Sequence, residues 1–247
     1  MKTFKRPDLW GIFLFLFPAF ASVCILFTFI GNSFCKEAPL FAATSPQKRD
    51  TLTLIIDAGH GGEDGGTVGV NGEFEKDLNL EIAFLLRDMA LSAGYETVMT
   101  RTEDILLYDR NVDYKGRKKA LDLLARVKIA EQYENAIFVS IHMNAFPDKK
   151  YSGLQVYYSK NNPLSEALAK DIQDGVRLSL QEKNNRKIKP AGSNIYLLDR
   201  ITLPSVLVEC GFLSNPEECE KLSDEEYRKK LALAIFLPLS KYLEAKS

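Results

Sequence analysis

The spacing of apolar residues along the chain predicts alternating strands and helices. Three short apolar runs, at 52–56, 136–141 and 205–208, are rich in β-branched residues, as expected of strands buried on both faces of a parallel sheet. Between them, apolar residues recur at helical spacing over 75–92 and 117–133. We therefore expect an α/β fold in a single domain, with a mostly parallel sheet flanked by helices on both faces.

Weaker patterns complete this alternation. Shorter strands are expected at residues 95–100, 154–158 and 194–198, and helices after the Asn-Pro pairs at 162–163 and 215–216. The sequence from Ser223 to Glu226 resembles a capping box for a last helix. Pro238 is expected to kink that helix or to end it early, because proline removes a backbone donor.

The first 30 residues have a different pattern from the rest of the chain. An almost uninterrupted apolar segment, 9–30, follows Lys2, Lys5 and Arg6, and about 20 such residues can span a bilayer as a helix. Basic residues before the segment favour a cytoplasmic N-terminus and an exported domain. Ala19-Phe20-Ala21 has the form of a signal-peptidase site, so secretion after cleavage is the alternative. Because the apolar run continues beyond that site, we favour an uncleaved anchor, and hence a single-pass membrane protein with an extracytoplasmic domain.

Composition limits the remaining possibilities. With 247 residues the chain can bury one substantial core, and its formal net charge of −1 provides no general attraction for nucleic acid. Residues 31–50 mix Pro, Ser, Ala and charged residues without periodicity, which indicates a linker. The predicted organisation is an anchor or signal sequence at 1–30, a linker at 31–50 and one folded domain at 51–245.

Candidate chemistry is concentrated where the three strongest strands end. The chain has only two histidines; His60 lies in a glycine-rich loop after the first run, and His142 follows the second. Glu209 ends the third run. In open α/β sheets ligands bind beyond the carboxyl ends of the strands, so we expect these side chains to converge. Two imidazoles and a carboxylate are the ligand set of a catalytic zinc with one position open to water, which suggests a hydrolytic metal site.

Each candidate also has a purely structural interpretation. A single histidine is more often a hydrogen-bonded structural residue than a ligand. Glu75, in the first turn of the expected helix, could simply interact with the helix dipole. Glu209 is harder to explain in this way, because an acidic residue that ends a buried strand needs a partner or a function.

Four motifs occur in order along the chain. They are DAGHGG at 57–62, Glu75 at the head of a helix, SIHMNA at 140–145 and VECGFLSN at 208–215. Together, from about Leu52 to the last helix, they resemble the zinc-dependent N-acetylmuramoyl-L-alanine amidases. The resemblance implies that His60, Glu75 and His142 bind zinc and that Glu209 is the catalytic carboxylate. It also implies that Asn144 contacts the zinc ligands or the substrate.

More local similarity points to one branch of that family. Residues 117–120, 126–128 and 152–155 resemble the germination-specific amidases of endospore-forming bacteria, membrane-anchored enzymes that act on spore-cortex peptidoglycan. In that branch, removal of the stem peptide precedes formation of muramic-δ-lactam. Only a short loop separates His142 from the expected strand at 154–158, which argues against the inhibitory helical insertion of division-type relatives. Control would then come from expression, localisation or a partner, such as an activating lipoprotein.

The resemblance also implies a mechanism and partners. Zinc would activate water, and Glu209 would accept the water's proton and return a proton to the departing amine of L-alanine. The expected partners are peptidoglycan glycan strands with their stem peptides, and the membrane. Two alternatives are a zinc exopeptidase of related fold and a non-catalytic cell-wall scaffold, and the complete set of four site residues argues against the scaffold.

Two further features have open interpretations. Cys210 and Cys219 could form a disulfide in an exported domain, but Cys210 could equally be a small buried residue behind Glu209. The basic stretch from Arg186 to Lys189 could contact glycan or a partner, and a solvated loop is the simpler interpretation.

Overall fold

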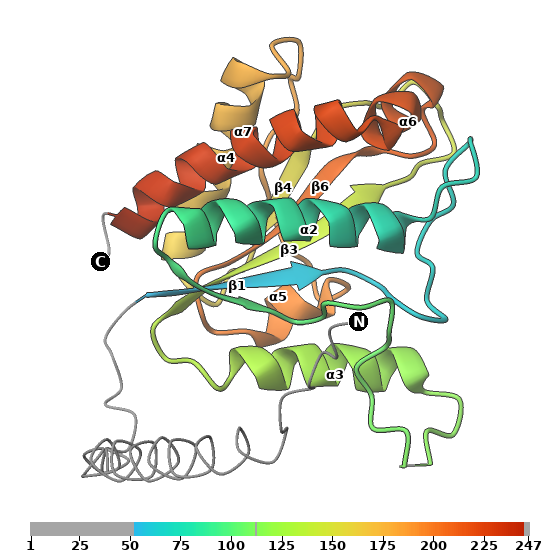
Figure 1. Cartoon of the computed structure of the whole chain (residues 1–247), viewed down its shortest axis with the longest axis vertical. Coiled ribbons are helices and arrows are strands. Elements are labelled where there is room, and N and C mark those ends of the chain that lie inside the picture. The colour runs from blue at the N-terminus through green and yellow to red at the C-terminus, as the bar shows by residue number, and fades with distance from the viewer. Residues whose placement is uncertain (1–51, 112, 245–247) are drawn as a thin grey trace, which may run out of the picture. The chain divides into compact units, whose positions relative to one another are not determined.

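A six-stranded sheet between two layers of helices forms the core of the molecule (Figure 1). The structure is a computed structural model that describes residues 52–111 and 113–244. The elements, in chain order, are β1 (Thr53–Ala58), α2 (Glu75–Ser92), β2 (Glu96–Met99), α3 (Lys118–Ala130), β3 (Ala136–Asn144), β4 (Gln155–Tyr158), α4 (Leu164–Ser179), β5 (Lys189–Pro190), α5 (Tyr196–Arg200), β6 (Ser205–Phe212), α6 (Pro216–Ser223) and α7 (Glu225–Glu244). The predicted α/β class is confirmed.

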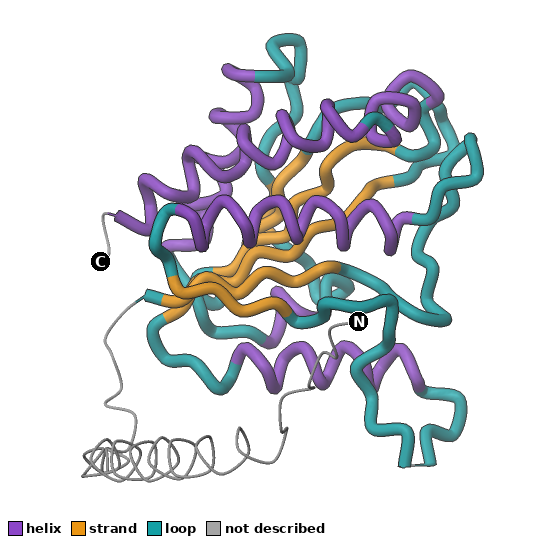
Figure 2. Tube along the Cα trace, in the orientation of Figure 1, coloured by secondary structure: helices purple, strands orange, loops and turns teal. Residues whose placement is uncertain are grey.

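The sheet has the strand order β2-β1-β3-β6-β4-β5 (Figure 2). β1 pairs in parallel with β2 and β3, and β3 pairs in parallel with β6. β4 runs antiparallel to β6, and β5 is parallel to β4. The start of β4 therefore lies at the same edge of the sheet as the carboxyl ends of β1, β3 and β6.

Both faces of the sheet are covered, as the apolar runs predicted. Leu54, Ile56 and Ala58 of β1 belong to a large core that also contains residues of α2, α4 and α7. The alternate residue Ile55 packs on the opposite face with Phe138 and with residues of α3 and α5. Successive side chains of a strand point to opposite faces, so a strand with a helix layer on each side is apolar throughout.

The expected strand at 194–198 is wrong, because α5 occupies part of this region. Leu197 and Leu198 are both buried but in different clusters: Leu197 packs with Ile55 and Phe138, whereas Leu198 packs with Ala191 and Leu207. Because α5 is a helical turn packed against the face of the sheet that carries Ile55, its neighbouring leucines enter two clusters on that same face. A strand would point them in opposite directions.

Two expectations for the last helices are corrected. Ser223 is the final residue of α6, and Asp224 caps α7 instead, its Oδ1 accepting from the N–H groups of Glu226 and Tyr227 at 2.7 and 3.2 Å. Pro238 does not end α7, which continues to Glu244. Gly175 of α4 gives space to the proline ring, since a Cβ on this glycine would lie 2.8 Å from Pro238 Cγ.

The predicted anchor and linker, at 1–30 and 31–50, lie outside the described residues and stay predictions. Among residues 52–111 and 113–244, no helix has the length and apolar character needed to span a bilayer.

Candidate metal centre and active site

The structure brings His60, Glu75, His142 and Glu209 to one edge of the sheet. His60 lies in the loop after β1, and Glu75 is the first residue of α2. His142 was expected just after its strand and Glu209 at the end of its own, but both lie within their strands, because β3 and β6 extend to Asn144 and Phe212. They are partners in the parallel register, and a bulge follows between His142 and Asn144.

The loop that carries His60 depends on two special backbone positions. His60 itself has a φ of +62°, a left-handed conformation that few residues other than glycine adopt. Gly59 lies against the His142 ring, where a Cβ would come within 2.2 Å of His142 Nε2. The lack of a side chain at residue 59 therefore allows the two imidazoles to approach each other.

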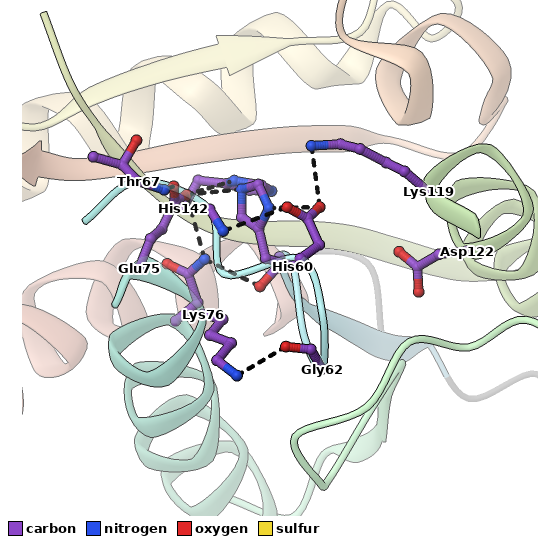
Figure 3. A network of polar contacts seen from close by, with 12 residues as sticks. His60, Gly62, Thr67, Glu75, Lys76, Lys119, Asp122 and His142 are labelled. Carbon is purple, nitrogen blue, oxygen red and sulfur yellow. Dashed lines mark hydrogen bonds and ion pairs between the residues drawn. The ribbon is translucent and has the colours of Figure 1, made fainter. Parts of the chain in front are cut away.

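The Glu75 carboxylate joins the two histidines (Figure 3). Its Oε1 lies 3.2 Å from His60 Nε2 and 3.0 Å from His142 Nδ1. The backbone N–H groups of Met143 and Thr67 donate to Oε1 and Oε2 at 3.1 and 2.8 Å and so fix the carboxylate. One ligand atom from each of the three residues lies within 4.8 Å of the others, as a shared metal ion requires.

Asp64 orients the His60 ring and was not predicted from the sequence. Its Oδ2 lies 2.9 Å from His60 Nδ1 and 3.0 Å from Lys119 Nζ. A carboxylate at one ring nitrogen favours the tautomer in which the other nitrogen keeps a free lone pair for a metal. The signal in the sequence is weak, because Asp64 is one of several acidic residues in a polar loop.

The pKa values of His60 and Glu75 are shifted by their neighbours in this cluster. Burial would lower the pKa of His60, but the adjacent carboxylates of Asp64 and Glu75 raise it to about 9. Burial would raise the pKa of Glu75, but hydrogen bonds with His142 and His60 bring it below its usual range. Without a metal this cluster therefore holds protons that a metal ion would displace.

Glu209 faces the same space from β6. It borders a cavity of about 240 Å³ together with His60, His142 and Tyr196. Its Oε2 is buried and accepts no hydrogen bond from the described residues, and burial raises its pKa to about 7. Asn144 does not line this cavity, and its backbone oxygen accepts from the Leu213 N–H at 2.9 Å.

A network of buried charged side chains holds the backbone of the His60 loop. Arg126, fully buried on α3, donates to Asp57 at 2.6 Å and to Asp122 at 2.8 Å. It also donates to the backbone oxygens of Ala58 and His60, both at 2.7 Å. Burial would raise the pKa of Asp57, but the Arg126 charge together with hydrogen bonds from Ser140 and Thr100 lowers it. Sequence reasoning missed the network, although an aspartate inside a buried strand signals a buried partner.

The disulfide interpretation is wrong, since Cys210 and Cys219 are both free and buried. Cys210 packs in the large core, as the alternative interpretation held. The Cys219 Sγ lies 3.0 Å from Asn71 Oδ1, which places this cysteine beside the 67–74 loop.

The model of the N-acetylmuramoyl-L-alanine amidase family matches residues 54–241. The chain belongs to this family. The match confirms the resemblance in the four motifs and favours an amidase that acts on peptidoglycan over an exopeptidase.

Individual relatives of the amidase agree with the family match. The germination-specific N-acetylmuramoyl-L-alanine amidase of Bacillus subtilis is 40% identical over 193 residues, which cover 78% of this chain and 80% of the relative. The CwlD amidase of Clostridioides difficile, solved in complex with the GerS lipoprotein, is 41% identical with a TM-score of 0.74, covering 79% of this chain and all of that one. The amidase AmiC2 of Nostoc punctiforme is 32% identical with a TM-score of 0.66, covering 78% of this chain and 97% of that one.

Proposed function

We propose that this amidase is zinc dependent and that His60, Glu75 and His142 hold the ion. The observation that carries the proposal is the convergence of His60 Nε2 and His142 Nδ1 on Glu75 Oε1. Two imidazoles and one carboxylate suit zinc better than calcium or magnesium, which prefer oxygen ligands. Asp64 on the far side of the His60 ring supplies the orienting contact that such ligands usually have.

Glu209 is the proposed general base and acid. A bound zinc would supply Lewis-acid activation of the attacking water and of the amide carbonyl. Glu209 accepts the proton of the attacking water and then donates a proton to the departing amine of L-alanine. A pKa of about 7, raised by burial, suits a group that must both take and give a proton near neutral pH.

The proposed setting is the spore cortex. The identity of 40% to the germination-specific enzyme supports removal of stem peptides from cortex muramic acid, the step that precedes muramic-δ-lactam formation. We propose that the 9–30 segment anchors the enzyme to the cell membrane with an extracytoplasmic catalytic domain. The complex of CwlD with a lipoprotein supports a lipoprotein partner for this chain.

Digestion of purified peptidoglycan tests the reaction. Cortex and vegetative material would be treated with zinc-loaded enzyme and with Glu209→Gln, and the products analysed by mass spectrometry. We expect stem peptides with a free L-alanine amino terminus from the parent only, in greater yield from cortex. Folded, zinc-loaded parent that releases no such peptides would contradict the proposed activity, and equal yields from both materials would contradict the cortex setting.

A further inference from the structure

Arg186 is held in a defined position, although its basic stretch resembles a solvated loop. The carbon of its guanidinium group lies 4.5 Å from the centroid of the Phe212 ring, and its Nη2 donates to Gln155 Oε1 at 3.0 Å. Its Nε is buried without a hydrogen-bond partner in the described part of the chain. The side chain is therefore ordered by two contacts that leave part of its donor capacity unused.

The two contacts place Arg186 beside Glu209. Gln155, which binds the guanidinium, is the partner of Glu209 in the antiparallel register of β4 and β6. The positive charge of Arg186 acts on the carboxyl of Glu209 and on the hydroxyl of Tyr157, two strand positions along from Gln155. Arg186, in the loop that precedes β5, thus binds the strand neighbour of the proposed general base.

Arg186 also borders a second, larger cavity of about 960 Å³. This cavity lies among the loop before β4, the residues after α4 and the start of α6, and Tyr151, Asn184 and Asn215 line it. Its volume is several times that of the cavity around His60 and His142. The larger cavity can therefore receive a sizeable part of a bound substrate.

Two of the acidic side chains that line the large cavity already have partners within hydrogen-bond distance. Glu217 forms an ion pair with Lys221 at 2.6 Å. Glu218 accepts from the backbone N–H groups of Gly153 and Phe212, both at 2.8 Å. Glu182 and Lys183 are neighbours in the chain, and both are exposed to solvent. Arg186 remains as a cation with no acidic partner within hydrogen-bond distance among the described residues.

We propose that Arg186 binds a carboxylate of the stem peptide, and that the large cavity receives the peptide side of the substrate. The inference rests on the proposed function, because it places the scissile amide at Glu209. The stem peptide starts at the amine released there and carries carboxylates, for which a planar guanidinium is the best-matched side chain. A group next to Glu209 is thus placed to contact the first residues of the stem peptide.

Binding to the full-length, zinc-loaded Glu209→Gln protein tests the proposal without hydrolysis. The probes are L-alanylglutamate with its γ-carboxyl blocked as an amide, so that only the α-carboxylate is free, and the same dipeptide with the α-carboxyl also converted to an amide. We expect the carboxylate form to bind about 10- to 100-fold more tightly, as for one charge-assisted hydrogen-bonded contact. Adding Arg186→Gln should reduce this ratio to near 1, and Arg186→Lys should restore part of it.

The matched control is Arg87→Gln. The guanidinium of Arg87 also lies 4.5 Å from a phenylalanine ring, that of Phe84, but it is on α2 and lines neither cavity. This variant should keep the parent ratio. A ratio near 1 in the parent, or a ratio unchanged by Arg186→Gln, would overturn the proposal. Because each ratio compares two ligands on one variant, a general loss of folding does not imitate the expected result.

Kinetics distinguish failure of this inference from failure of the proposed function. For muropeptides that carry the same two peptides, Arg186→Gln should raise KM for the carboxylate substrate about 10-fold or more and change kcat little. Hydrolysis of both substrates by the parent, with no difference in KM between parent and Arg186→Gln, would overturn the role of Arg186 alone. The dipeptide ratios answer the same question if the parent hydrolyses neither.

Discussion

The two faces of the sheet bury different kinds of side chain. On the face toward α2, α4 and α7, β1 and β6 contribute Leu54, Ile56 and Val208 to one large apolar core. On the opposite face, Ile55 of β1 is also packed among apolar residues, but the next residue on that face is Asp57, which is fully buried. The same strands therefore provide only packing on the α2 side, and both packing and chemistry on the other side, the polar face, because their side chains alternate.

The interactions that stabilise the fold therefore differ from those that position the site residues. Buried charges destabilise a protein unless they are paired and hydrogen-bonded. On the polar face Arg126 pairs with Asp57 and Asp122 and holds the backbone of the His60 loop. The polar face therefore depends on complementary charges, whereas the apolar face depends on close packing.

The largest expected effect is on the polar face, in the metal ligands. His142→Ala should lose bound zinc and amidase activity together, because two ligands do not hold a catalytic zinc. Glu209→Gln should keep zinc and lose about 10²- to 10⁴-fold in kcat, the usual contribution of a general acid-base group. Metal analysis and peptide-release assays on both variants check this. Stoichiometric zinc in His142→Ala would contradict its role as a ligand.

Breaking the charge network should affect stability and metal binding at once. Arg126→Met leaves Asp57 and Asp122 buried without their partner, a change that costs about 3–5 kcal/mol. It also removes the donor to the His60 backbone oxygen, so zinc affinity should fall. Chemical denaturation and zinc titration measure the two effects. A variant with reduced stability and parental zinc affinity would show that the network does not position the loop.

The matched change on the apolar face is Leu86→Ala. Leu86 is fully buried on α2, and its truncation should cost about 2–5 kcal/mol through lost burial and a cavity. Zinc affinity of the folded protein should stay as in the parent, since the side chain packs in the core away from the ligands. Loss of zinc affinity comparable to that of Arg126→Met would remove the distinction between the faces.

The pH dependence of stability should reveal the buried Glu209. Its pKa in the fold is raised from 4.5 to about 7, so the fold favours the protonated form. The corresponding stability is fully present below pH 4.5 and is lost as the pH rises through about 7, up to about 3 kcal/mol. Denaturation of the metal-free parent and of Glu209→Gln from pH 4.5 to 8 should show a larger loss in the parent, since His60, whose pKa is raised to about 9, titrates in both proteins. Parallel profiles would contradict the raised pKa.

The smallest expected effect concerns the cysteines. Since Cys210 and Cys219 are free, a reducing agent should leave the unfolding midpoint of the domain unchanged. Denaturation with and without dithiothreitol measures this, with thiol titration as the control for two accessible thiols per unfolded domain. A marked loss of stability on reduction would mean that a disulfide forms in the protein.

The sequence predicted the elements of the site better than the contacts between them. Composition predicts the strands β1, β3 and β6, and the periodic spacing of apolar residues predicts α2. The two histidines are recognisable as candidates because each follows an apolar run. Arg126 and Asp57 are 69 positions apart, and no local pattern links them.

The failures have physical reasons of the same kind. The α5 region contains Ile195 and Tyr196, which suit a strand by propensity, and only the packing of Leu197 and Leu198 against two clusters favours a helical turn. Pro238 was expected to kink α7 or to end it early. The helix continues to Glu244, and the space that Gly175 of α4 gives the proline ring is a tertiary contact that local sequence does not reveal. Arg186 resembles a solvated residue in sequence, since nothing nearby shows that Phe212 and Gln155 hold it.

The most direct test of the account is a crystal structure of the zinc-loaded enzyme, with anomalous scattering data at the zinc edge. We predict one peak in the cavity on the polar face, about 2.0–2.2 Å from His60 Nε2, His142 Nδ1 and a Glu75 carboxylate oxygen. Glu209 should approach the open side of the ion without binding it. A peak held by other residues, or by Glu209 in place of Glu75, would contradict the assignment of the site.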